Sequence, residues 1–122
     1  MSVHFKGRSF LFRLRFALQG LGFALTHERS FRAQSLAAVM VLISLLVIRP
    51  PLIWGALVMA MVGLVLAAEL FNTALEQILD GLHPQPADFV QSAKDCAAAA
   101  VLMLSCAAVV VYGLMLRAVG FD

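Results

Sequence analysis

Four polar side chains between residues 69 and 80 have types and spacing that suit metal-dependent chemistry. They are Glu69, Asn72, Glu76 and Asp80, and we call them the carboxylate stripe. On a helix all four fall within a sector of about 80°, so they share one face. Three carboxylates on one face repel one another, and a bound cation would remove that repulsion. Carboxylate and amide oxygens are hard ligands that suit Mg²⁺ or Mn²⁺.

The members of the stripe differ in their position relative to the apolar sequence. Glu76 and Asp80 could lie on the solvated face of a cytoplasmic helix extension and have no chemical role. Glu69 directly follows the uncharged run 50–68, so it lies near the hydrocarbon boundary of a membrane. An acidic side chain at membrane depth costs roughly 3 kcal/mol, which is hard to explain by structure alone. We therefore expect Glu69 to take part in chemistry.

Three charged residues outside the stripe have both a structural and a functional explanation. Lys94 could extend its amine to the membrane interface, and Asp95 could complement a helix N-terminus. Alternatively, the two side chains contact phosphate and position a metal or nucleotide. Glu28 could pair with Arg32 one helical turn later and have no further role.

The elements that must position these side chains are membrane helices. Hydrophobic residues make up 62% of the 122-residue chain and charged residues 13%, which excludes an ordinary soluble enzyme of this size. Three uncharged runs, 33–48, 50–68 and 96–116, each approach the roughly 20 residues that a spanning helix needs. We therefore predict a single all-α membrane domain over residues 1–122. Its transmembrane helices are expected at about 32–48, 51–80 including a cytoplasmic extension, and 93–117.

The segment before the first span predicts the orientation of the chain. From about residue 5 to residue 28, Phe and Leu mix with Arg and Gln, which is typical of an amphipathic helix lying in the headgroup plane. Six of the nine Lys and Arg residues precede residue 33. Because basic segments stay on the cytoplasmic side, we expect a cytoplasmic N-terminus and an outside C-terminus. Anionic lipid headgroups, and not nucleic acid, are the expected partner of this basic segment.

Three motifs follow one another along the chain. They are Glu28-Arg-Ser-Phe31-Arg32, then the carboxylate stripe with its intervening residues, then Ala93-Lys94-Asp95 followed by Ala98-Ala-Ala-Val101-Leu102. Over nearly the whole chain, their order and spacing resemble the prokaryotic diacylglycerol kinase family, whose relatives include undecaprenol kinases. The chain has no Walker A loop and no protein-kinase signature, and this family has neither. The resemblance implies a homotrimer of three-span subunits in the bacterial cytoplasmic (inner) membrane, with active sites between neighbouring chains.

The resemblance also implies a role for each matching residue. Glu69 would be the general base that takes the proton from the lipid hydroxyl. Glu28 and Glu76 would hold the divalent metal, Mg²⁺, on ATP. The residues expected around the nucleotide are Glu28, Asn72, Glu76, Asp80, Lys94 and Asp95. Those expected to contact the lipid are Glu69, Phe31 and Arg32.

The predicted function is ATP-dependent phosphorylation of a membrane lipid alcohol, with diacylglycerol favoured over undecaprenol as the acceptor. Two alternatives belong to other functional classes. One is a small proton-coupled transporter that uses Glu69, and the other is a non-enzymatic membrane scaffold. The chain departs from the family pattern at Gln34, where an acidic residue or histidine is common, and in the loop His83 to Ala87. Arg8, Arg13 and Arg15 are alternative counterparts of the family's N-terminal arginine. The parts that contact lipid are the least constrained by the family pattern, so the acceptor stays open between diacylglycerol and undecaprenol.

Overall fold

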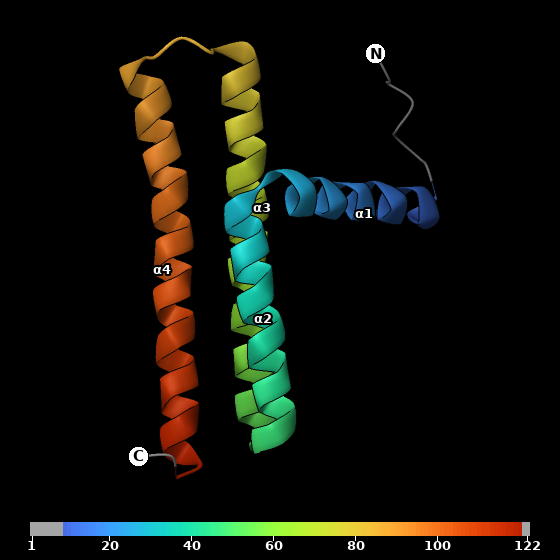
Figure 1. The fold of residues 1–122 in the computed structure, drawn as a ribbon, viewed down its shortest axis with the longest axis vertical. Helices are drawn as coiled ribbons and strands as arrows, with labels where there is room; N and C mark the ends of the chain where they lie inside the picture. Colours follow the sequence, from blue (N-terminus) through green and yellow to red (C-terminus); the bar gives the residue numbers. More distant parts are fainter. Residues whose placement is uncertain (1–8, 121–122) are drawn as a thin grey trace.

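The computed structural model describes residues 9–120, which form four α-helices and no strand. The helices are α1 (Phe10–His27), α2 (Arg29–Ile48), α3 (Leu52–Leu82) and α4 (Asp88–Ala118). Three of them, α2, α3 and α4, run alongside one another, whereas α1 lies crosswise to them (Figure 1). The same three are long and apolar enough to cross a membrane. The predicted all-α membrane fold with a surface helix and three spans is confirmed.

The helix ends differ from the predicted ones at a few positions. The part of the predicted surface helix at residues 5–8 lies outside the described residues, and α1 begins at Phe10. Helix α3 continues to Leu82, and α4 begins at Asp88 and not near residue 93. Pro84 and Pro86 confine the break to residues 83–87, and the acidic Asp88 suits the first turn of a helix.

Two short connections set the directions of the first three helices. Glu28 has an extended backbone that separates α1 from α2. Arg32 bridges the bend, since its Nη1 donates to the carbonyl oxygens of Leu25 and Thr26 at 3.1 and 3.0 Å. Arg49 ends α2 in the left-handed region (φ 51°, ψ 58°), and two prolines follow it before α3 starts. A residue before proline avoids the right-handed helical region, so α2 ends here and the chain turns toward α3.

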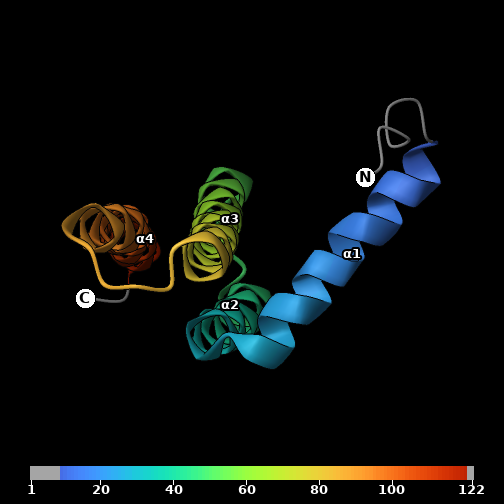
Figure 2. The same cartoon turned by 90° about the horizontal axis from the view of Figure 1, so that it is seen from above.

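Helix α3 is the element against which the others pack. It packs along α4 and along α2, and α1 contacts both α2 and α3 (Figure 2). Within residues 9–120 the backbones of α2 and α4 do not come close to each other. Two side-chain hydrogen bonds join these helices instead, from Gln34 to Ser105 at 3.4 Å and from Tyr112 to Ser44 at 2.8 Å.

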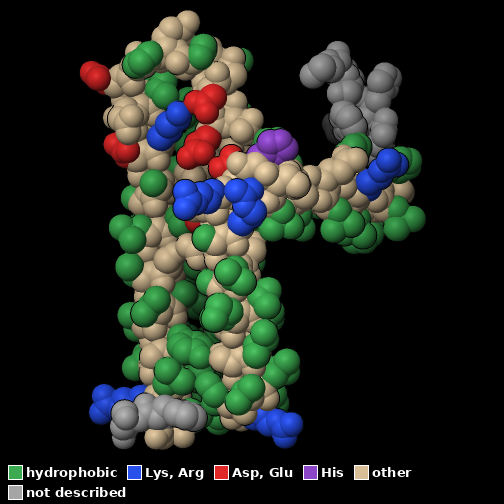
Figure 3. Space-filling view, viewed as in Figure 1, with side chains coloured by type: hydrophobic (Ala, Val, Ile, Leu, Met, Phe, Trp, Pro, Cys, Tyr) green, Lys and Arg blue, Asp and Glu red, His purple; other side chains and the backbone are tan. Residues whose placement is uncertain are grey.

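Most large apolar side chains lie on the outside of the molecule. Among the described residues, Leu46 and Leu52 are 75% and 92% exposed, whereas few side chains, such as Phe31 and Met115, are buried. Apolar side chains cover the lower part of the helices in Figure 3. A surface of this kind suits lipid or further helices, because monomeric soluble proteins rarely expose large apolar patches.

Helix α1 meets α3 directly after the apolar part of α3. Residues of α1 and of α3, among them Ala24, Leu70 and Thr73, line a shared cavity where the two helices meet. The part of α3 from Leu52 to Ala68 has a length of about 25 Å, close to the roughly 30 Å of a bilayer's hydrocarbon core. Glu69 directly follows this apolar part of α3, so its place at the hydrocarbon boundary stays a prediction that the length of the helix fits.

Candidate active site

The carboxylate stripe lies on α3 next to the start of α2 and the start of α4. Acidic side chains gather there, close to Lys and Arg side chains and above the level of α1 (Figure 3). Three separate contacts involve the stripe: one at Glu69, one between Asn72 and Glu76, and one at Asp80. The stripe is thus a series of local sites that differ in burial.

Glu69 is almost fully buried, with 2% of its surface exposed. Its Oε1 accepts a hydrogen bond from Ser30 Oγ of α2 at 2.8 Å. The carboxylate lines a cavity of about 360 Å³ between α2, α3 and α4, which we call the Glu69 cavity. Ser30, Gln34, Asn72 and Ser105 line it together with apolar residues of α4. A carboxylate held by one donor beside a cavity is suited to accept a proton from a hydroxyl placed there.

Asn72 and Glu76 form the second contact. Asn72 Nδ2 donates to Glu76 Oε1 at 3.2 Å, and Asn72 Oδ1 is buried without a hydrogen-bond partner. A buried carbonyl oxygen without a donor is costly, and a cation would satisfy it. Within residues 9–120, no group of three or more His, Cys, Asp or Glu side chains is placed to hold a metal ion. The two residues therefore offer a partial set of oxygen ligands, which fits Mg²⁺ that also binds substrate phosphates.

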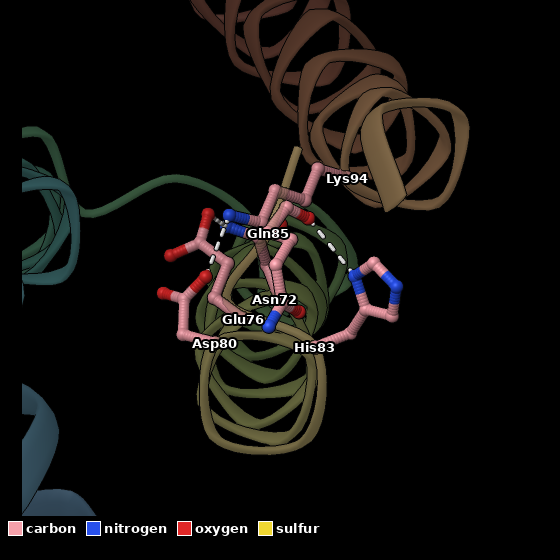
Figure 4. Close-up of polar contacts among 6 residues, drawn as sticks. All are labelled: Asn72, Glu76, Asp80, His83, Gln85 and Lys94. Carbon is pink, nitrogen blue, oxygen red and sulfur yellow. Dashed lines mark hydrogen bonds and ion pairs between the residues drawn. The ribbon is translucent and has the colours of Figure 1, made fainter. Parts of the chain in front are cut away.

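Asp80 and Lys94 form the third contact, at the C-terminal end of the stripe. Lys94 Nζ lies 2.8 Å from Asp80 Oδ1, and the two side chains are 33% and 63% exposed. The carboxylates of Glu76 and Asp80 lie on the same side of α3, where the Lys94 amine approaches them (Figure 4). Because this ion pair is exposed to water, it contributes little to stability.

The loop after α3 borders a separate cavity of about 450 Å³ that also includes Asp80 and Lys94. His83 Nδ1 lies 2.9 Å from the carbonyl oxygen of Gln85, and the His83 ring meets the Phe89 ring edge-on at 4.9 Å between centroids. These contacts give the loop a defined shape beside the exposed ion pair. The loop is thus positioned to border a ligand that contacts Lys94.

The structure does not bring every predicted site residue to the stripe. The Glu28 carboxylate forms no hydrogen bond or ion pair with the stripe in the described part of the chain, although Glu28 lies at the bend between α1 and α2. Asp95 is exposed and accepts a hydrogen bond from Gln91 of its own helix at 2.8 Å. Phe31 is buried, and Arg32 binds the last carbonyls of α1. The substrate contacts expected of these four residues stay predictions.

Sequence reasoning missed Ser30 and the role of Gln34 as a cavity residue. Ser30 and Gln34 are one helical turn apart and share a face of α2, which the sequence alone could have shown. Nothing in the spacing says that this face turns toward Glu69. The residues of α3 and α4 that Ser30 and Gln34 contact are known only from the packing of the helices.

Comparison with known proteins gives two findings. Residues 15–116 match the profile of the family described as prokaryotic diacylglycerol kinase. A protein of Synechocystis sp. named diacylglycerol kinase is 36% identical over 107 residues. The matched segment covers 87% of this chain and 61% of that relative, so the chain spans less than two thirds of the relative's length.

Proposed function

The chain belongs to the prokaryotic diacylglycerol kinase family, and on that premise we propose that it phosphorylates a membrane lipid alcohol with Mg-ATP. Diacylglycerol is the favoured acceptor, which would give phosphatidic acid, and undecaprenol is the alternative. The observation that carries this proposal is the burial of Glu69 beside a cavity, directly after the apolar part of α3. At that depth, a lipid hydroxyl and a nucleotide from the cytosol can meet.

Glu69 would act as the general base. Its carboxylate takes the proton of the lipid hydroxyl while the hydroxyl oxygen attacks the terminal phosphorus of ATP and the bond to the ADP oxygen breaks. The hydrogen bond from Ser30 holds the carboxylate in place, and proton transfer requires this positioning. Phosphoryl transfer depends mainly on such positioning and on stabilisation of charge.

The oxygen atoms of Glu76 and Asn72 would hold the metal, with Glu28 as a further ligand. Mg²⁺, when bound with ATP, neutralises charge on the phosphates. The buried and unpaired Oδ1 of Asn72 supports this assignment. Lys94 lies beside Asp80 and would exchange that partner for a nucleotide phosphate. Asp80 and Asp95 would then contribute to nucleotide positioning.

The assembly and orientation belong to the same proposal. A homotrimer would place a neighbouring chain beside Glu28 and Asp95, which do not reach the stripe of their own chain. The N-terminus and the stripe would face the cytoplasm, with Arg49 and Arg117 at the other end of the spans. Chemical crosslinking in mild detergent tests the trimer, because a trimer gives a ladder that ends at three chains.

Transfer of label from radioactive ATP to lipid tests the proposed activity. The purified protein is placed in mixed micelles that contain diacylglycerol or undecaprenol, with and without Mg²⁺. We expect Mg²⁺-dependent label in diacylglycerol. No label in either lipid, from protein with an intact cooperative unfolding transition, would overturn the proposal. ATP-independent proton efflux from vesicles that contain the protein would support a transporter instead.

A further inference from the structure

Two cavities meet where Gln34 of α2 contacts Ser105 of α4. Both residues line the Glu69 cavity, and both also line a second space, of about 250 Å³, which we call the α2–α4 groove. Apart from Gln34, Ser105 and Tyr112, the groove is lined by apolar residues such as Val41, Leu66 and Ala108. The Gln34–Ser105 contact therefore separates a polar cavity from an apolar one.

The groove runs along the part of the helices that is expected to lie in the hydrocarbon core. Gln34 marks its upper part, and the hydrogen bond from Tyr112 to Ser44 joins α2 and α4 further down. On α2 the groove extends from Gln34 to Val41, which is about 10 Å along a helix. An apolar groove of this length and depth, continuous with the Glu69 cavity, suits a hydrocarbon chain attached to a group beside Glu69.

The contact between Gln34 and Ser105 is weak enough to open. The distance from Gln34 Nε2 to Ser105 Oγ is 3.4 Å, which is long for a hydrogen bond, and both side chains are only partly buried. A glutamine amide has two N–H donors, and a serine hydroxyl has one. The pair can therefore donate to a carbonyl oxygen that enters from the Glu69 cavity.

Diacylglycerol and undecaprenol differ in the chemistry that this pair would recognise. In diacylglycerol, an ester is attached to the carbon next to the one that carries the free hydroxyl. Its carbonyl oxygen is a hydrogen-bond acceptor close to the reacting group. A polyprenol has only hydrocarbon at that distance from its hydroxyl, so it would leave the amide and hydroxyl without a lipid partner. A site that loses such a hydrogen bond discriminates against the ligand that lacks the acceptor.

We propose that Gln34 and Ser105 select a glycerol ester as the acceptor, by donating a hydrogen bond to its carbonyl while one acyl chain occupies the α2–α4 groove. This inference rests on the proposed kinase function and names the lipid class for it. The hydroxyl of the same lipid lies in the Glu69 cavity. Gln34 and Ser105 are thus specificity residues, whereas Glu69 acts on the reacting oxygen.

The test compares lipids that differ only at the carbonyl. Label transfer is measured with a diacylglycerol and with the dialkyl ether of the same chain length, which has no carbonyl oxygen. We expect kcat/KM to favour the ester by roughly 3- to 10-fold, the range of one net hydrogen bond. Gln34→Met keeps the length of the side chain and removes its donors, so the ratio should fall toward one. Gln34→Glu and Ser105→Ala should lower the ratio in the same direction.

Tyr112→Phe is the matched control. It removes the hydrogen bond to Ser44, which is far from the headgroup, and should change the rates with both lipids alike. If both lipids are phosphorylated and the ester preference is absent, or is the same in the Gln34 and Ser105 variants as in the parent protein, the inference is wrong and the kinase function stands. Preference of the parent protein for undecaprenol would also overturn it. If no lipid is phosphorylated, the proposed function fails and the inference fails with it.

Discussion

The two ends of the carboxylate stripe are chemically alike and physically different. Glu69 and Asp80 are both carboxylates on the same face of α3, but Glu69 is 2% exposed and the Asp80 side chain is 63% exposed. Ser30 holds the first through a neutral hydroxyl, and Lys94 holds the second through a charge. One face of α3 can thus carry a buried carboxylate in a fixed position and a solvated carboxylate whose partner can exchange. The level of α1 divides them.

The strongest test of this difference is Glu69→Gln. The substitution keeps the size of the side chain but removes the base, so lipid phosphorylation should fall roughly 10²- to 10⁴-fold. The initial rate of label transfer measures the loss, and the unfolding transition in detergent checks that the protein remains folded. A rate within about tenfold of the parent protein would show that Glu69 is not the general base.

Glu76→Gln tests the middle of the stripe, between the buried and the exposed ends. Loss of a metal-ligand oxygen should raise the Mg²⁺ concentration needed for half-maximal activity, whereas the KM for lipid should stay near that of the parent protein. Losses of roughly 10- to 100-fold in metal affinity are typical even for the groups that support ligands. An unchanged Mg²⁺ titration would remove Glu76 from the metal site.

Ser30→Ala asks whether the buried end depends on its fixed geometry. A hydrogen bond to a charged group contributes about 1.5–3 kcal/mol, so its loss should lower kcat roughly 10- to 100-fold. Ser30→Thr retains the hydroxyl and serves as the control that should recover most of the rate. Equal rates for the alanine and threonine variants would mean that the contact does not position Glu69.

Asp80→Asn gives the smallest expected effect, and it concerns stability. The exposed ion pair with Lys94 should contribute little to the free energy of unfolding, and added salt should reduce this contribution further. A double-mutant cycle with Lys94→Met, measured from unfolding transitions in detergent, isolates the pair. A coupling energy that is large and insensitive to salt would contradict the interpretation of this pair as solvated and exchangeable.

The sequence predicted the helices well because their signals are local. Uncharged runs marked the spans, and the helical period placed Glu69 and Asp80 on one face. The start of α4 at Asp88 was missed, since the polar residues before the apolar run resemble a loop as much as a helix. The sequence also could not show that Ser30 meets Glu69 or that Arg32 binds the end of α1. Both contacts depend on how one helix is rotated about its axis relative to its neighbour. The residue pattern of a single helix does not determine that rotation.

The crosswise position of α1 makes the proposed reaction at Glu69 depend on the thickness of the membrane. Helix α1 contacts α3 just above Glu69, and the apolar part of α3 below that contact has a length of about 25 Å. In a thicker bilayer, either the lipid around the protein must thin or Glu69 must sink below the headgroups, at a cost of a fraction of a kcal/mol per Å. We expect the rate in vesicles to be highest for lipids whose hydrocarbon thickness matches this length. The activity of the protein would then report the thickness of the membrane that surrounds it.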